Sequence, residues 1–322
     1  MIVSLPEALL HAVEGELENH DQTAIRNAAD ALSLAYRGQR GISRTLSPVE
    51  RAAYLAVRFP STFAAARVAW EQAALVTDLT EVQTVLDAGA GPGTASLAGS
   101  AIVKAARFTQ LERDTGWRQV AGQLAHAAGI DATFQTGALP GTLAAHDVIF
   151  AAYALNELPT ATLENTIAEL WFASRKALIV LEPGTPKGFA VVETARSSLI
   201  AAGAHAAAPC THNDHCPMST SDWCHQPVRV ARSAHHRSAK HGALAFEDEK
   251  FSYLVLTREP PRRLAPARIV RKPIKNAGHV HLDVCTDGMM QRVTVARSNK
   301  TFYHDARDAS WGDTWPPDQV GG

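Results

Sequence analysis

The sequence is poor in cysteine, with four among 322 residues. So few cysteines exclude the disulfide scaffold of a small secreted domain. The sequence also lacks any apolar run near the roughly 18 residues that a membrane-spanning helix needs. No lysine or arginine precedes Arg26, so the basic start of a secretory signal or an arginine-rich transit peptide is missing. These absences predict a chain that works in the reducing cytoplasm and does not enter a membrane.

Charge of neither sign is in excess, because 31 basic and 32 acidic side chains leave a formal net charge of −1. The total therefore excludes no class of partner, and only the distribution of charge is informative. Between residues 226 and 275, twelve lysines and arginines stand against four acidic residues, a local net charge of +8. Contact with nucleic-acid phosphates requires such a basic segment, although a solvated surface is the alternative.

The pattern of apolar residues predicts an α/β domain with additions at both ends, in a chain long enough for about two domains. Residues 1–76 have helical spacing, and SPVERAAYLAVRF opens with Ser47 and Glu50 at the positions of a capping box. Between residues 77 and 259, the runs TVL, ARFTQL, HDVIFAAY, KALIVL and FSYLVL alternate with helical stretches. This order is typical of a doubly wound, mostly parallel sheet. Short β-like runs in residues 260–322 predict a small β module.

A glycine-rich loop follows the first of these strands. Asp87, Gly89, Gly91 and Gly93 belong to the sequence DAGAGPG, between the strand TVL and a helical stretch. Glycine permits a tight turn and lets the backbone approach a ligand closely. A nicotinamide site favours G-x-G-x-x-G, whereas this loop has G-x-G-x-G with an acid two residues before its first glycine. A tight turn without a ligand remains the alternative.

The loop resembles the first motif of class I methyltransferases, which bind S-adenosylmethionine. The resemblance implies that Asp87 and the Gly89–Gly93 loop belong to the cofactor site, with the loop around the methionine part. Glu112 ends the next strand, nineteen residues after Gly93. An acid at that position accepts hydrogen bonds from ribose hydroxyls. Asp147, which enters the strand DVIFAAY, would lie near the fourth motif of these enzymes.

Two side chains of the sequence ALNELP, Asn156 and Glu157, could face a transferred methyl group. Methyl transfer needs a nucleophile near the sulfonium and often a base. The Asn-Pro-Pro-Tyr/Phe motif of amino-methylating enzymes is missing, and no cysteine follows a strand as a nucleophile would. Glu182 in EPGTP also follows a strand and is expected at the same rim, where ligands bind in such folds. Helix capping or a salt bridge is an equal alternative for both Glu157 and Glu182. The sequence therefore favours cofactor binding over turnover.

Three of the four cysteines lie close together in a segment rich in histidine. Cys210, Cys216 and Cys224 belong to residues 203–246, which contain seven of the fourteen histidines. We expect this segment to be an insertion that a metal orders, because it has little apolar surface to bury. Cys285 lies in the C-terminal module, so a site of all four would join insertion and module. Four thiolates suit zinc or an iron–sulfur cluster, and in a zinc site a nearby histidine could replace one cysteine.

Seven motifs, in order, resemble the mitochondrial small-ribosomal-subunit methyltransferase-like protein family and its bacterial relatives. They are AYLAVRFPSTFAA, LDAGAGPGT, ALNELP, LEPGTPKGF, PCTHNDHCP, WCHQPVRVAR and EDEKFSYLVL. The resemblance implies a class I methyltransferase fold and a [4Fe–4S] cluster held by Cys210, Cys216, Cys224 and Cys285. It also implies RNA and protein partners in the small ribosomal subunit, whose assembly the family attends.

Three functions are compatible with these expectations. The first is an S-adenosylmethionine-binding, cluster-containing factor for assembly of the small ribosomal subunit or for translation, acting as a monomer on ribosomal RNA. The second is an active ribosomal RNA methyltransferase in which Asn156 and Glu157 face the methyl group. The third is a zinc-stapled RNA-binding protein without enzymatic activity. Metal content and turnover distinguish the three.

Overall fold

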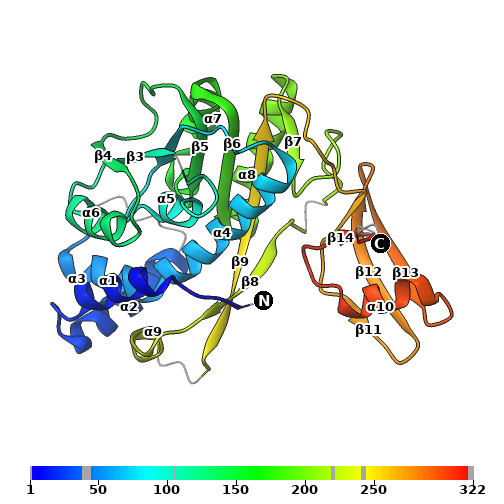
Figure 1. Ribbon diagram of the computed structural model, residues 1–322, viewed down its shortest axis with the longest axis horizontal. Helices are drawn as coiled ribbons and strands as arrows, with labels where there is room; N and C mark the ends of the chain where they lie inside the picture. Colours follow the sequence, from blue (N-terminus) through cyan, green and yellow to red (C-terminus); the bar gives the residue numbers. More distant parts are fainter. Residues whose placement is uncertain (1, 38–44, 105, 219–221, 241–243, 318–322) are drawn as a thin grey trace.

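The computed structural model describes residues 2–37, 45–104, 106–218, 222–240 and 244–317, and Figure 1 shows a large α/β unit beside a smaller β unit. The helices are α1 Glu7–Leu17, α2 Gln22–Arg37, α3 Pro48–Val57, α4 Phe59–Val76, α5 Thr94–Gly99, α6 Trp117–Ala127, the 3-10 helix η1 Leu155–Glu157, α7 Thr160–Ala173, α8 Pro186–Ala201, α9 Ala234–Ala239 and α10 Lys300–Asp308. The strands are β1 Ile2–Val3, β2 Thr84–Ala88, β3 Arg107–Glu112, β4 Ala132–Thr136, β5 His146–Ala152, β6 Ser174–Pro183, β7 His205–Ala208, β8 Gln226–Ala231, β9 Phe246–Thr257, β10 Ala267–Ile269, β11 Ile274–Lys275, β12 His279–Thr286, β13 Met289–Ala296 and β14 Thr314–Trp315.

The large sheet has nine strands, and its central part is parallel. The strand order is β1-β8-β9-β6-β5-β2-β3-β4, with β7 also paired to β9. Parallel pairs join β2 to β3, β2 to β5, β3 to β4 and β5 to β6. β9 runs antiparallel to β6, β7 and β8. Because the winding direction reverses between β2 and β5, a crevice is expected at the carboxyl ends of these two strands.

Helices cover both faces of the large sheet. Neighbouring residues of a strand point to opposite faces. In β2, Val85 packs into the core shared with helices α1 to α6, whereas Leu86 packs into the core shared with α7 and α8. The same alternation occurs in β5, where Val148 and Ile149 belong to different cores. The prediction of apolar strands buried on both faces is therefore confirmed.

The N-terminal region is helical, as expected, apart from its first residues. The Ser47 side chain accepts a hydrogen bond from the Glu50 backbone N–H (3.3 Å), and the Glu50 carboxylate accepts one from the Ser47 N–H (2.8 Å). The predicted capping box is thus present at the start of α3. β1 pairs in parallel with β8, which helical spacing did not predict. Among the described residues, no helix is long and apolar enough to cross a bilayer.

The expectation that residues 203–246 form an insertion with little core of its own is wrong for the two strands within it. β7 and β8 both pair with β9 in the large sheet. Val228 and Val230 are buried in the main core, while Arg229 between them is exposed. The alternation in QPVRVA is that of a strand with one buried face. The connection between β7 and β8 lacks helix and strand in its described part, and it contains three cysteines.

The C-terminal residues form a separate antiparallel sheet, as predicted. Its order is β11-β12-β10-β14, with β13 also paired to β12 (Figure 1). Ile269, Leu282 and Trp315 contribute to its own small core, and α10 supplies Ala306. The side chains of β12 alternate between this core and the opposite face, which places Cys285 on the side away from Leu282 and Val284. Cys285 can therefore face the large unit.

Candidate functional site

The first candidate site is a pocket at the carboxyl ends of β2 and β5, which we call the switch-point pocket. Its wall includes Gly89 and Gly91 from the glycine loop. All three loop glycines have positive φ angles, 75° at Gly89, 52° at Gly91 and 86° at Gly93. A Cβ atom at Gly89 would lie 2.6 Å from the Cβ of Ala154, whereas one at Gly91 would meet no atom within 4 Å. The loop therefore needs glycine for its turn and also leaves open space for a ligand.

Two acidic residues predicted for cofactor binding hold the glycine loop and the helix that follows it. The buried Asp87 carboxylate accepts hydrogen bonds from the backbone N–H and the hydroxyl of Ser96, both at 2.9 Å. Burial raises the pKa of Asp87 to about 7. Glu112 lines the pocket and accepts hydrogen bonds from the N–H groups of Gly91 and Asp114, both at 2.9 Å. Glu112 thus fixes the loop from inside the pocket.

The two predicted catalytic residues lie in η1, directly after β5, and both line the switch-point pocket. The side-chain amide of Asn156 donates a hydrogen bond to the fully buried Glu182 carboxylate. Glu182 also accepts from the N–H groups of Leu155 (3.0 Å) and Asn156 (3.3 Å). Glu157 is an exposed residue, but desolvation by the surrounding pocket raises its pKa to about 7. Complete burial raises the pKa of Glu182 to about 8. Glu182 therefore holds the start of η1 by accepting from its first two backbone N–H groups, as the helix-cap alternative predicted, and it forms no salt bridge among the described residues.

Asp147, which was predicted for the cofactor site, lies away from the switch-point pocket. Its carboxylate accepts hydrogen bonds from the N–H groups of Gln83 (2.9 Å) and Thr84 (3.0 Å) at the start of β2. Asp147 is near the amino end of β5, and five residues of extended chain, about 16 Å, separate it from Ala152 at the pocket. In parallel strands the amino ends share one edge of the sheet, so Asp147 lies at the edge opposite the pocket.

The pocket has walls that the sequence did not indicate, because they come from the N-terminal helix α3, from α6 and from a strained residue. Tyr54 and Trp117 line it and contact each other edge to face, with ring centroids 5.5 Å apart. Tyr153 follows β5 with a φ of 56°, which is unusual for a residue other than glycine. Its N–H donates to the Leu181 carbonyl at 2.7 Å. Backbone strain of this kind is concentrated at functional sites.

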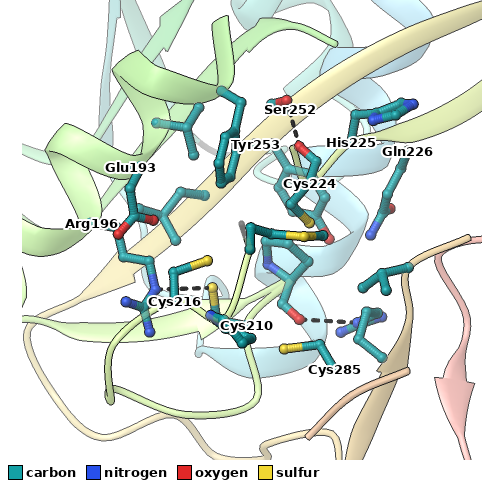
Figure 2. A pocket seen from close by; sticks show the side chains of 18 of the residues that line it. Glu193, Arg196, Cys210, Cys216, Cys224, His225, Gln226, Ser252, Tyr253 and Cys285 are labelled. Atoms are coloured by element: carbon teal, nitrogen blue, oxygen red, sulfur yellow. Dashed lines mark hydrogen bonds between the residues drawn. The ribbon is translucent and has the colours of Figure 1, made fainter. Parts of the chain in front are cut away.

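The second candidate site is a cavity that all four cysteines line, which we call the cysteine cavity. Cys210, Cys216 and Cys224 reach it from the connection between β7 and β8, and Cys285 reaches it from β12. Figure 2 shows their side chains gathered around one space between the large sheet and the β module. All four are free thiols and are half-buried. The structure thus brings together the four residues predicted as metal ligands.

Burial and mutual proximity disfavour the ionised form of these thiols. Burial raises the pKa of Cys216 to about 12 and that of Cys285 to about 11. The pKa of Cys224 is raised further, first by burial and then by the negative charge that the other three cysteines would carry. Four thiolates this close repel one another unless a cation lies between them. Bound metal would supply the missing positive charge.

The cysteines surround a space and do not converge on a point. Within the described ranges, no three or more His, Cys, Asp or Glu side chains are arranged to hold one metal ion. His212 contacts Cys285, with its Nε2 3.7 Å from the sulfur, and His225 stacks on Trp223. A single zinc ion needs sulfur atoms about 2.3 Å from the metal. A cluster of several iron and sulfide atoms is larger than one zinc ion, so the cysteine sulfurs that bind it lie further apart.

Comparison with known sequences identifies the family. A profile described as mitochondrial small ribosomal subunit Rsm22 matches residues 48–316, which is most of the chain. This chain belongs to the Rsm22 family.

Relatives of this Rsm22-family chain include two proteins named as mitochondrial ribosome assembly proteins. Human METTL17 is 28% identical over 287 residues, which cover 82% of this chain and 62% of METTL17. RSM22 of Saccharomyces cerevisiae is 46% identical over 50 residues, which cover 15% of this chain and 8% of RSM22. The chain therefore spans less than two thirds of the length of these relatives.

Solved structures similar to this Rsm22-family chain include two methyltransferases. Magnesium protoporphyrin IX methyltransferase from Synechocystis, with bound S-adenosylmethionine, is 16% identical, with a TM-score of 0.42 over 74% of this chain and 98% of that one. A methyltransferase from Aquifex aeolicus that depends on the same cofactor is 14% identical, with a TM-score of 0.42 over 67% and 100%. At such low scores the class I methyltransferase-like fold rests on the strand order itself, with β9 antiparallel beside β6.

Much of the positive charge in residues 226–275 of this Rsm22-family chain is already engaged. Within the described residues, at least five of the twelve basic side chains form ion pairs with aspartate or glutamate: Arg229, Arg232, Lys240, Arg262 and Arg271. Two of their partners, Asp78 and Asp222, lie outside this range of the sequence. These two partners lower the local net charge from +8 to +6, because the other partners, Glu247 and Asp248, are already counted in it. Pairing between distant residues was not visible in the sequence.

Proposed function

We propose that this chain is an assembly factor of the small ribosomal subunit that binds ribosomal RNA and S-adenosylmethionine and carries a [4Fe–4S] cluster. The single observation that carries the proposal is the cavity lined by Cys210, Cys216, Cys224 and Cys285. Membership of the Rsm22 family supports the ribosomal part, since both relatives described above are named as ribosome assembly proteins.

The donor set and the shape of the cysteine cavity fit a cubane cluster. Four cysteine thiolates are the ligand set of [4Fe–4S] clusters. Three of the cysteines belong to the large unit and the fourth to the β module. When bound, the cluster would join two sheets that are otherwise connected through the chain and side-chain contacts. Loss of the cluster would therefore loosen the β module relative to the large unit.

The switch-point pocket fits S-adenosylmethionine in its position and its walls. It lies where ligands bind in doubly wound sheets, outside the carboxyl ends of the strands. Gly91 leaves room for the ligand, and Glu112 lies beside it with a carboxylate that can accept further hydrogen bonds. Tyr54 and Trp117 provide aromatic surface, and Asp87 and Glu157 are acidic groups for a sulfonium cation.

Purification without oxygen, followed by visible absorption and analysis of iron, sulfide and zinc, tests the cluster. We expect a brown protein with about four iron and four sulfide per chain. Cys285→Ser should lose iron, while Met290→Ser, opposite Cys285 on β13, should keep it and serves as the matched control. A colourless protein with one zinc would favour the zinc-stapled alternative. A protein without metal would contradict the proposal.

Binding to small-subunit ribosomal RNA tests the partner. The loaded protein should bind this RNA more tightly than Cys285→Ser does, because the cluster fixes the β module. Filter binding at two salt concentrations would measure the affinity and the number of phosphate contacts. Equal RNA affinity of the loaded protein and of Cys285→Ser would show that RNA binding does not depend on the cluster.

Methyl transfer is the second candidate function, because Asn156 and Glu157 line the same pocket as the glycine loop. An active enzyme would move labelled methyl from S-adenosylmethionine to ribosomal RNA. Glu157→Gln should then reduce turnover with little loss of cofactor affinity, whereas Gly91→Arg should abolish both. Cofactor binding without label transfer would favour the assembly factor.

A further inference from the structure

Two arginines line the cysteine cavity and are almost completely buried. Arg196 of α8 is 3% exposed, and Arg268 of β10 is 4% exposed. They reach the cavity from the large unit and from the β module respectively. Both contribute to the environment of Cys210, because each guanidinium lowers the pKa that burial alone would give this thiol. The cavity is therefore flanked by positive charge on two sides.

The hydrogen-bond partners of both arginines are uncharged groups and a cysteine. Arg196 Nε donates to the Cys210 sulfur at 3.4 Å, as Figure 2 shows. Its Nη2 donates to the backbone carbonyls of His212 (2.9 Å) and Asp214 (2.6 Å). Arg268 donates to the carbonyl of Pro209 (3.1 Å) and to further oxygens of Gln72 and Gly312. Carbonyl oxygens satisfy N–H donors but do not neutralise a charge.

A buried charge without a counter-charge is costly. Neither guanidinium forms an ion pair with a carboxylate in the part of the chain that the structure describes. Glu193 is the acidic side chain lining the cavity, and Figure 2 places it beside Arg196. One carboxyl group cannot balance two guanidinium groups. The remaining negative charge must come from the four cysteine thiolates and the group that they bind.

We propose that Arg196 and Arg268 are the counter-charges of the metal centre and raise the reduction potential of the cluster that the cysteines hold. The inference rests on the cluster of the proposed function. A [4Fe–4S] cluster with four thiolates is a dianion when oxidised and a trianion after it accepts one electron. Two buried positive charges stabilise the trianion more than the dianion. Net charge and hydrogen bonds to sulfur are known determinants of cluster potential.

A redox titration of variants tests the role of the charge. Arg196→Gln and Arg268→Gln keep an N–H donor but remove the charge, whereas Arg196→Lys and Arg268→Lys keep the charge. Arg258→Gln is the matched control, because Arg258 also donates to backbone carbonyls but stacks on Trp171 and does not line the cavity. The titrant supplies one electron per cluster, and no bond forms or breaks. Iron and sulfide are counted first in every variant.

With four iron per chain, the two glutamine variants should show midpoint potentials more negative than wild type. The lysine variants should lie closer to wild type, and Arg258→Gln should not shift. Glutamine variants at the wild-type potential would overturn the inference while leaving the cluster in place. If a glutamine variant loses iron but the lysine variant at the same position keeps it, the result supports the role of the positive charge. Loss of iron from both variants would overturn the inference. A wild-type protein without iron would refute the cluster, and the inference with it.

Discussion

Gly89 offers a sharp test of the switch-point pocket, because a methyl group at this position meets a single defined neighbour. In Gly89→Ala the new Cβ would lie 2.6 Å from the Cβ of Ala154, well inside van der Waals contact. The φ angle of 75° adds backbone strain of about 1–2 kcal/mol. The close contact between the new methyl group and Ala154 adds a further cost of about 1–3 kcal/mol from overpacking. The free energy of unfolding should therefore fall by about 2–5 kcal/mol.

Gly91→Ala is the matched comparison, since the φ angle at Gly91 is also positive but its Cβ would meet no atom within 4 Å. It should cost about 1–2 kcal/mol of backbone strain and no more. Its methyl group points into the space proposed for S-adenosylmethionine. The affinity of Gly91→Ala for S-adenosylmethionine should therefore fall more than its small loss in the free energy of unfolding can explain.

Removing the neighbour tests the cause of the Gly89 effect. Ala154→Gly deletes the Cβ that the new methyl group would contact, so the double variant should recover about 1–3 kcal/mol of the overpacking term. Urea unfolding of the two single variants and the double variant measures this coupling energy directly. A coupling energy of zero, or equal losses in Gly89→Ala and Gly91→Ala, would refute the packing argument.

Three further predictions concern acidic side chains. Asp147→Ala removes a carboxylate that accepts hydrogen bonds from two backbone N–H groups, so it should lower the free energy of unfolding by about 1–3 kcal/mol. Calorimetry should find the affinity for S-adenosylmethionine unchanged. Weaker binding would contradict the position of Asp147 away from the pocket. The affinity for S-adenosylmethionine should rise from pH 6 to 8, because Asp87 and Glu157 have raised pKa values of about 7 and ionise in that range. An affinity that calorimetry finds to be the same at every pH would contradict this. The raised pKa of Glu182, about 8 against 4.5, means that the folded state keeps a proton which the unfolded state has lost. Its contribution to stability should therefore fall as pH rises from 5 to 8, and Glu182→Gln should flatten this decrease in urea unfolding.

Local patterns in the sequence were sufficient for the secondary structure around the site. The capping box at Ser47 and Glu50 and the glycine loop depend on residues within a few positions of one another. β2, β3, β5 and β6 were visible as apolar runs, because both of their faces are buried. The parallel edge strand β4 was missed, because none of its residues is buried. The switch-point pocket could be placed for the same reason, since its glycine loop directly follows one strand.

Long-range geometry explains the errors and omissions. Asp147 was assigned to the pocket through the resemblance to the fourth methyltransferase motif, but the pocket lies at the other end of its strand. Residues 203–246 were expected to depend on a metal for order, yet β8 takes part in the large sheet through pairing with β9. Arg196 was not singled out, although a charged residue between Val192 and Leu199 on the apolar side of a helix was a readable sign.

The sequence by itself determined the types of residue available and the segments in which they lie, because propensity and periodicity act over a few neighbouring positions. It indicated four cysteines as possible ligands, but Cys285 lies more than sixty residues beyond Cys224. Only the tertiary structure decided that the two meet in one cavity, that buried arginines flank it, and that much of the basic segment is paired. Such contacts depend on which strands pair and which faces pack, and no local pattern encodes that choice.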